Sequence, residues 1–191
     1  MMSLKKSSFL LNLSNSSKHL LSSPYFPSTI LVMENFKVTN PFILKLILQK
    51  MTNSIYPCLW FDGQAQTAAK FYCSVFKNSK IISDNQMVVI FELDGKKFMG
   101  LNGGPHYKFT EAVSFVVDCE SQEEIDHYWT KLTADGGEEG RCGWLKDKFG
   151  VSWQIVPTVL SKLMNNPDKA QKVIAAFMKM KKFDIKTLEE V

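Results

Sequence analysis

The stretch Cys142-Gly-Trp-Leu-Lys-Asp-Lys-Phe-Gly-Val-Ser-Trp-Gln-Ile-Val-Pro157 predicts a complete β-hairpin. Its loop, residues 147–150, ends in a glycine, which suits a position with positive φ. The strand that follows alternates, so that one face would be buried under a helix by Val151, Trp153 and Ile155. Gln154 lies on the opposite face with Ser152 and Val156, and is either a site residue or a solvated side chain.

The residues just before this hairpin predict a strand and a helix. Residues 112–119 alternate and are mostly apolar, as expected for a half-covered strand. Ser121 suits an N-cap, with Glu124 three residues later. The helix would bury a stripe and end at Asp135-Gly136-Gly137; that stripe consists of Ile125, Tyr128, Trp129 and Leu132. The second half therefore reads β-α-β-β-β.

The first half repeats this order. Its expected elements are a strand at 55–61, a helix at 64–76 and strands at 80–83, 87–93 and 97–102. The turn Asp94-Gly95 occupies the same place as Phe149-Gly150. We therefore expect an α+β fold of tandem β-α-β-β-β modules, followed by C-terminal helices at 158–164 and 168–180 and a short one capped by Asp184.

Residues 1–50 differ in composition from the rest. They are rich in Ser, Asn, Lys and Leu, contain three prolines, and carry six lysines against one glutamate. Such a segment is typical of a disordered, dispensable extension or of an organelle transit peptide, although it lacks arginine. We expect a leader at 1–50 and one domain at 51–191, in a cytoplasmic protein or, if the leader is a transit peptide, a mitochondrial one.

The composition of the chain excludes several partners and sites. The formal charge of +4 comes from the leader, so residues 51–191 offer no basic surface for nucleic acid. The longest apolar runs are shorter than the roughly 20 residues of a membrane span. The cysteines are widely spaced, without a CxxC or CxxH pair, which indicates free thiols at Cys58, Cys73, Cys119 and Cys142.

Several motifs of residues 51–191 resemble one family. They are Pro57-Cys-Leu-Trp-Phe-Asp-Gly63, Ala68-Ala-Lys-Phe-Tyr72, Phe91-Glu-Leu-Asp-Gly95, Leu101-Asn-Gly-Gly-Pro105, Ala112-Val-Ser-Phe-Val-Val117 and residues 142–157. The tandem repeat resembles the vicinal oxygen chelate superfamily of glyoxalase, bleomycin-resistance and extradiol dioxygenase proteins. The motifs look like its PhnB-like family, often labelled a 3-demethylubiquinone 3-methyltransferase domain. This resemblance implies a curved mixed sheet with a cleft, and a homodimer. The chain departs from the family at residues 82–86, where the loop is short.

Metal-dependent members of that superfamily hold a divalent ion with His and Glu side chains from the first and last strands of each repeat. The resemblance places Tyr56, Met99, Ala112 and Gln154 at these positions. None offers an ionised oxygen or an imidazole, and a shift of one residue adds only Glu111. We therefore expect neither a metal nor another cofactor.

The cleft implied by the resemblance still suits a small-molecule ligand. Its predicted residues are Cys58, Trp60, Met99, Ser114 and Gln154, with Asn102, His106 and Trp144 at its border. Apolar and aromatic walls with a few hydrogen-bonding groups are typical of such pockets. Core packing is the alternative for the cysteine, the methionine and the tryptophans, and an exposed loop is the alternative for His106.

Two functions follow from these residues. No Gly-rich turn between a strand and a helix supports a methyl-donor nucleotide, and no Ser-His-Asp or Cys-His arrangement supports nucleophilic catalysis. The first hypothesis is metal-independent binding of a small, partly apolar molecule. The second is an enzyme of the superfamily that acts on a quinone-like or other small aromatic substrate.

Overall fold

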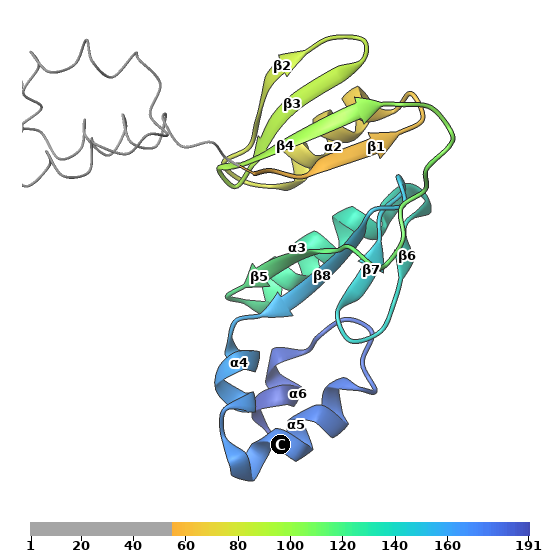
Figure 1. The fold of residues 1–191 in the computed structure, drawn as a ribbon. Coiled ribbons are helices and arrows are strands. Elements are labelled where there is room, and N and C mark those ends of the chain that lie inside the picture. The colour runs from red at the N-terminus through yellow and green to blue at the C-terminus, as the bar shows by residue number, and fades with distance from the viewer. Residues whose placement is uncertain (1–54) are drawn as a thin grey trace, which may run out of the picture. The chain divides into compact units, whose positions relative to one another are not determined.

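The computed structural model describes residues 55–191 and shows two β-α-β-β-β modules followed by three helices (Figure 1). The first module consists of β1 (Cys58–Phe61), α2 (Ala65–Val75), β2 (Lys80–Asp84), β3 (Val88–Leu93) and β4 (Lys96–Asn102). The second consists of β5 (Phe115–Cys119), α3 (Gln122–Thr133), the 3-10 turn η3 (Ala134–Gly136), β6 (Glu138–Glu139), β7 (Trp144–Lys146) and β8 (Ser152–Pro157). The C-terminal helices are α4 (Val159–Met164), α5 (Pro167–Phe177) and α6 (Ile185–Glu189). The predicted tandem α+β repeat is confirmed, and the predicted leader lies outside the described residues.

The two sheets have the same topology, with strand orders β1-β4-β3-β2 and β5-β8-β7-β6. In each, the first strand pairs parallel with the last, and the other neighbours are antiparallel. The glycines of the predicted equivalent turns, Gly95 and Gly150, both have positive φ, at 71° and 86°. Each stands just before the last strand of its module, so the predicted equivalence of the turns is confirmed.

Two strands begin three residues later than predicted. The strand predicted at 55–61 starts at Cys58, because Pro57 has no N–H for the ladder and only its carbonyl pairs, with Met99 N at 3.0 Å. The strand predicted at 112–119 starts at Phe115, opposite Trp153. In this parallel register, residues 112 and 113 would face Gly150 and Val151, which precede the start of β8 at Ser152.

The helices begin where side chains satisfy their free N–H groups. Ser121 caps α3 by accepting a hydrogen bond from Glu124 N at 3.3 Å, as predicted. Asn166 and Asp184 cap α5 and α6 in the same way. Helix α2 has no local cap of this kind. Instead Asn102, at the end of β4, accepts from Ala65 N at 2.8 Å, so β4 fixes where α2 starts.

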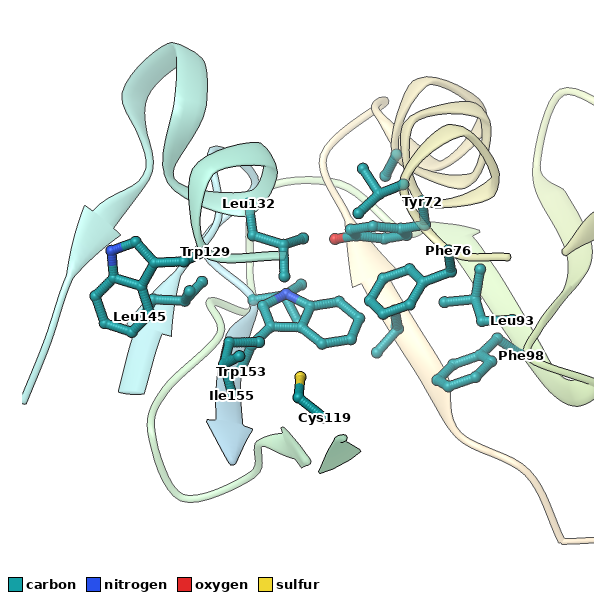
Figure 2. Close-up of a cluster of buried hydrophobic side chains, with 14 of the residues drawn as sticks. Tyr72, Phe76, Leu93, Phe98, Cys119, Trp129, Leu132, Leu145, Trp153 and Ile155 are labelled. Carbon is teal, nitrogen blue, oxygen red and sulfur yellow. The ribbon is translucent and has the colours of Figure 1, made fainter. Parts of the chain in front are cut away.

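One buried cluster contains side chains of both modules. Figure 2 shows the ring of Trp153 beside Tyr72 of α2 and Phe76, the residue that follows α2, with Leu132 of α3 near it. Phe98 of β4 and Phe115 of β5 meet edge to face at 5.3 Å. The predicted burial of Val151, Trp153 and Ile155 is confirmed, with exposed fractions of 2%, 3% and 0%.

The C-terminal helices dock on the loop that leads into β7. Backbone N–H groups of Cys142 and Gly143 donate to Met180 O and Lys181 O at 2.9 and 2.7 Å. Gly143 has a φ of +81°, and a Cβ there would lie 2.4 Å from the ring of Phe183, so the contact requires glycine. Helix α5 ends at Phe177, three residues before its predicted end at 180. Within residues 55–191, none of the helices is long and apolar enough to cross a membrane.

Candidate functional site

Each sheet has a face opposite its helix, which we call its open face. On the first sheet this face carries Cys58, Trp60, Ile90, Met99 and Leu101. On the second it carries Val116, Asp118, Trp144, Gln154 and Val156. All these side chains are half-buried or exposed, whereas their neighbours along each strand are mostly buried. The open faces are therefore the surfaces available to a ligand.

Two of the four residues predicted at metal positions do not lie on the first strands of the repeats. Tyr56 and Ala112 precede their strands and lie outside the sheets. The residue paired with Met99 is Cys58, and the residue paired with Gln154 is Val116. Val116 was missed because the alternation of residues 112–119 cannot show where pairing starts.

The two pairs Cys58–Met99 and Val116–Gln154 do not fit a divalent ion. They offer a thiol, a thioether, an isopropyl group and a neutral amide, so an ion would have no ionised ligand. Partial desolvation raises the pKa of the Cys58 thiol, which keeps it protonated at neutral pH. Among the described residues, no group of three or more His, Cys, Asp or Glu side chains could hold a metal ion.

On the second open face, three predicted site residues lie together. Gln154 Nε2 donates to Ser114 Oγ at 2.8 Å. Trp144 is the neighbour of Gln154 on the antiparallel strand β7. Val116, on the other side of Gln154, is 57% exposed. The amide and hydroxyl thus form a polar pair between an indole ring and an aliphatic side chain.

On the first open face, a loop covers Trp60. Its indole Nε1 donates to Gly104 O at 2.8 Å, and its ring meets Tyr107 edge to face at 4.9 Å. A Cβ on Gly103 would lie 2.2 Å from the indole, so the loop approaches this closely only with glycine there. His106 lies in the same loop and is exposed. Cys58 and Met99 remain neighbours on β1 and β4.

Asn102 serves the fold of the first module. Its Oδ1 caps α2, and its Nδ2 donates to Gln66 Oε1 at 2.8 Å and to Gln86 O at 3.0 Å. These bonds use its acceptor and both donors, which leaves one lone pair of the amide oxygen for a ligand.

The structure thus divides the eight predicted residues into two groups. Cys58, Trp60, Met99, Asn102 and His106 belong to the first module, whereas Ser114, Trp144 and Gln154 belong to the second. Within residues 55–191, no hydrogen bond or ring contact joins the groups. A single cleft formed by both groups therefore stays a prediction.

Two cavities lie beside the second sheet. The larger, of about 470 Å³, is a groove between β5, β8 and α4, lined by Asp118, Val156, Pro157, Thr158, Leu160, Ser161 and Met164. The smaller, of about 140 Å³, is lined by Trp144, by Glu111 and Ser152, and by five residues that the sequence did not single out. The groove was missed because one of its walls is a helix, whose docking no local pattern reveals.

Asp147 is the charged group most deeply integrated into the core, at 2% exposed. Its Oδ2 accepts from Tyr72 OH and Trp153 Nε1, both at 2.8 Å, and its Oδ1 accepts from Phe149 N and Val151 N at 2.8 and 3.1 Å. Burial raises the pKa of Asp147, although these bonds act in the opposite direction. The group has no free lone pair and links α2 to the second hairpin. The sequence signal for this acceptor was a tyrosine and a tryptophan on predicted buried faces, because their O–H and N–H groups need hydrogen-bond acceptors when buried.

Comparisons with known proteins agree with the motifs. Residues 53–156 match the model of the family described as 3-demethylubiquinone-9 3-methyltransferase. A solved structure described as a 3-demethylubiquinone-9 3-methyltransferase, PhnB protein, from Bacillus cereus is 33% identical, with a TM-score of 0.51 over 56% of this chain and 100% of that one.

Other solved structures are more distant. A glyoxalase-related enzyme from Fulvimarina pelagi is 15% identical, with a TM-score of 0.44 over 57% of this chain and 91% of that one. The fosfomycin resistance protein FosX from Listeria monocytogenes is 16% identical, with a TM-score of 0.46 over 60% of this chain and 98% of that one. No curated protein matches the chain. The family match, the 33% identity and the tandem repeat together show that the chain belongs to the PhnB-like 3-demethylubiquinone-9 3-methyltransferase family of the vicinal oxygen chelate superfamily.

Proposed function

We propose that this protein binds a small, partly apolar molecule, without a metal ion, in the groove between the second sheet and α4. The observation that carries the proposal is the groove itself. Its volume of about 470 Å³ falls within the range of roughly 300–1,000 Å³ that is usual for small-molecule pockets.

The lining of the groove indicates the kind of ligand. Val156, Leu160 and Met164 form an apolar wall, and methionine adapts to ligands of different shape. Asp118 is the one charged residue of the lining, and it is exposed. The ligand that fits has an aliphatic or aromatic body and a hydrogen-bond donor for this carboxylate. The family match ends at residue 156, so the whole α4 wall of the groove lies outside the matched residues.

The turn between β1 and α2 in the first module favours ligand binding over methyl transfer as the function. The family description names a methyltransferase, and a methyl-donor nucleotide is commonly bound at a Gly-rich turn between a strand and a helix. Here only residues 62–64 join β1 to α2, with Gly63 as the single glycine. The first N–H of α2 is already bonded to Asn102. This turn therefore offers little to a nucleotide.

We also propose that two copies of the chain associate through their open faces. On the second open face, Val116 is 57% exposed, and Trp144 and Val156 are half-buried. Apolar side chains gathered on a sheet face favour an interface, and a second copy presents the same surface. Analytical ultracentrifugation of the full chain should give a dimer, and Val116→Asp should shift it toward monomer.

The ligand proposal is tested with a thermal-shift screen of the full chain against fragments that vary in apolar size and charge. Hits should include aromatic or branched fragments with a donor group. Val156→Glu, which puts a charge into the groove wall, should abolish their shifts. Ile174→Glu is the matched control, because Ile174 is an exposed residue of α5 that does not line the groove.

Either of two outcomes would contradict the proposal. One is a screen without a saturable hit. The other is a set of hits that respond equally to Val156→Glu and Ile174→Glu. Incubating each hit with the protein and measuring product would separate a binding protein from an enzyme that acts on a small aromatic substrate.

A further inference from the structure

A buried serine without a hydrogen-bond partner lies in the smaller cavity of the second module. Ser152 is 1% exposed, and its Oγ is the single buried side-chain oxygen or nitrogen among residues 55–191 that lacks a partner. A buried hydroxyl without a partner is costly, so its presence requires an explanation. Ser152 lines the cavity of about 140 Å³, which makes a ligand of that cavity the natural partner.

The sheet register determines what surrounds the hydroxyl. Ser152 on β8 pairs with Lys146 on β7, which pairs with Glu138 on β6. Residues paired across neighbouring strands point to the same side of a sheet, so these three form one row. Glu111, from the segment before β5, forms an ion pair with this row: its Oε1 lies 2.6 Å from Lys146 Nζ. All four residues line the cavity.

The charges of the cavity favour a cation. Its lining contains three glutamates and one lysine. Lys146 is engaged by Glu111, and Glu139 is engaged by Trp129 Nε1 at 2.8 Å and Lys181 Nζ at 3.2 Å. In the part of the chain that the structure describes, Glu138 has no ion-pair partner. One carboxylate is therefore left to balance a positive charge beside the hydroxyl.

We propose that this cavity is a site for a small primary ammonium ion, which donates hydrogen bonds to Ser152 Oγ and the Glu138 carboxylate and lies against the Trp144 ring. Ammonium groups interact favourably with the face of an indole. The ligand has at most about six non-hydrogen atoms, since a cavity of about 150 Å³ admits benzene. The site is separate from the groove at Val156, which lies four residues further along β8, about 13 Å away.

Entry to the site requires one movement. The Ser152 hydroxyl is covered, and the neighbouring Lys146 side chain is 35% exposed. Its ion pair with Glu111 is at the surface and therefore weak, so the lysine can swing aside and be replaced by the ligand's ammonium group. Replacing Lys146 with an uncharged residue would open the site and would also remove a positive charge that repels the ammonium ligand.

The proposal is tested by NMR titration of the full chain at low ionic strength with three probes of similar size. Butylammonium should bind saturably and shift the Trp144 indole resonance. Tetramethylammonium has the same charge but no N–H donor, and should bind at least roughly tenfold more weakly, the usual scale for lost bonds to a charged group. Butyrate should not bind. Equal binding of the two cations, or preferential binding of butyrate, would overturn the proposal.

Variants connect binding to named residues. Ser152→Ala and Glu138→Gln should each weaken butylammonium binding roughly tenfold, and Lys146→Met should strengthen it. Glu120→Gln, which removes an exposed carboxylate on the β5–α3 connection, is the matched control and should leave the affinity unchanged. An affinity of Ser152→Ala equal to that of the wild type would refute the site.

Stability without ligand gives an independent readout. Since the hydroxyl lacks a partner, Ser152→Ala should leave the melting temperature unchanged or raise it. A fall of several degrees would show that the hydroxyl already has a partner within the protein, and would remove the reason for the site. Failure of this site would leave the groove proposal intact, because Val156 lines the groove and does not line the cavity at Ser152.

Discussion

Asp147→Asn should destabilise the described domain strongly, because the replacement keeps the shape of the side chain but turns one acceptor into a donor. The carboxylate accepts four hydrogen bonds, two at each oxygen. The new amide nitrogen would face two of these donors, either Tyr72 OH and Trp153 Nε1 or the N–H groups of Phe149 and Val151. Each buried donor left without an acceptor costs about 1–3 kcal/mol, so we expect the two to cost about 2–6 kcal/mol.

Chemical denaturation followed by tryptophan fluorescence measures this loss. Since about 1 kcal/mol changes the melting temperature of a domain of this size by roughly 3 °C, the expected decrease in melting temperature is roughly 6–18 °C. Asp135→Asn is the matched control, because Asp135 is exposed and its bond to Lys148 Nζ, at 3.1 Å, is worth less than about 1 kcal/mol. Equal stability of Asp147→Asn and Asp135→Asn would refute the reasoning.

The same residue predicts a dependence on pH. Burial raises the pKa of Asp147, so the folded chain binds its proton more readily than the unfolded chain. The contribution of this group to stability is therefore complete below the unfolded pKa of about 3.9 and is lost as pH rises through the folded pKa. Asparagine does not titrate. The wild type should thus exceed Asp147→Asn in free energy of unfolding by more near pH 4 than at pH 7. A difference that grows as the pH rises would contradict a raised pKa of Asp147 in the folded chain.

Three further predictions concern the loop, the metal and the C-terminal helices. Gly103→Ala should displace the Trp60 indole and change the fluorescence of the folded protein, whereas the same change in the Trp60→Phe background should not. Protein purified without chelators should contain no stoichiometric divalent metal, and EDTA should leave its melting temperature unchanged; about one metal per chain, lost on Gln154→Ala, would contradict this. Phe183→Ala should cost about 3–5 kcal/mol, because this ring is 3% exposed and packs on Gly143, and a loss below about 1 kcal/mol would show that the helices are not docked there.

Local patterns in the sequence determined the elements of this protein and their repetition. The alternation around Trp153 identified the buried face of β8, and Ser121 with Glu124 identified the start of α3. The Asp94-Gly95 and Phe149-Gly150 turns marked the equivalent hairpins, because each turn needs a residue that tolerates positive φ. These features depend on a few consecutive residues and on backbone preferences, so they can be read without the fold.

Pairing between distant strands was decided by the tertiary structure. The family resemblance placed Tyr56 and Ala112 on the first strands of the repeats, whereas in the structure Cys58 pairs with Met99 and Val116 pairs with Gln154. The alternation of a strand repeats every two residues and shows which residues share a face, but it does not show where pairing begins. The starting residue depends on the partner strand, which is far away in the sequence.

The environment of single polar residues was also decided by the tertiary structure. Ser152 shares its face with Gln154, yet it is buried, because Lys146 and the segment at Glu111 lie against it. Asp147 reads as an ordinary turn residue and is instead the acceptor that joins α2 to the second hairpin. Burial and hydrogen bonding sum over neighbours from several elements, and only the folded chain brings those neighbours together.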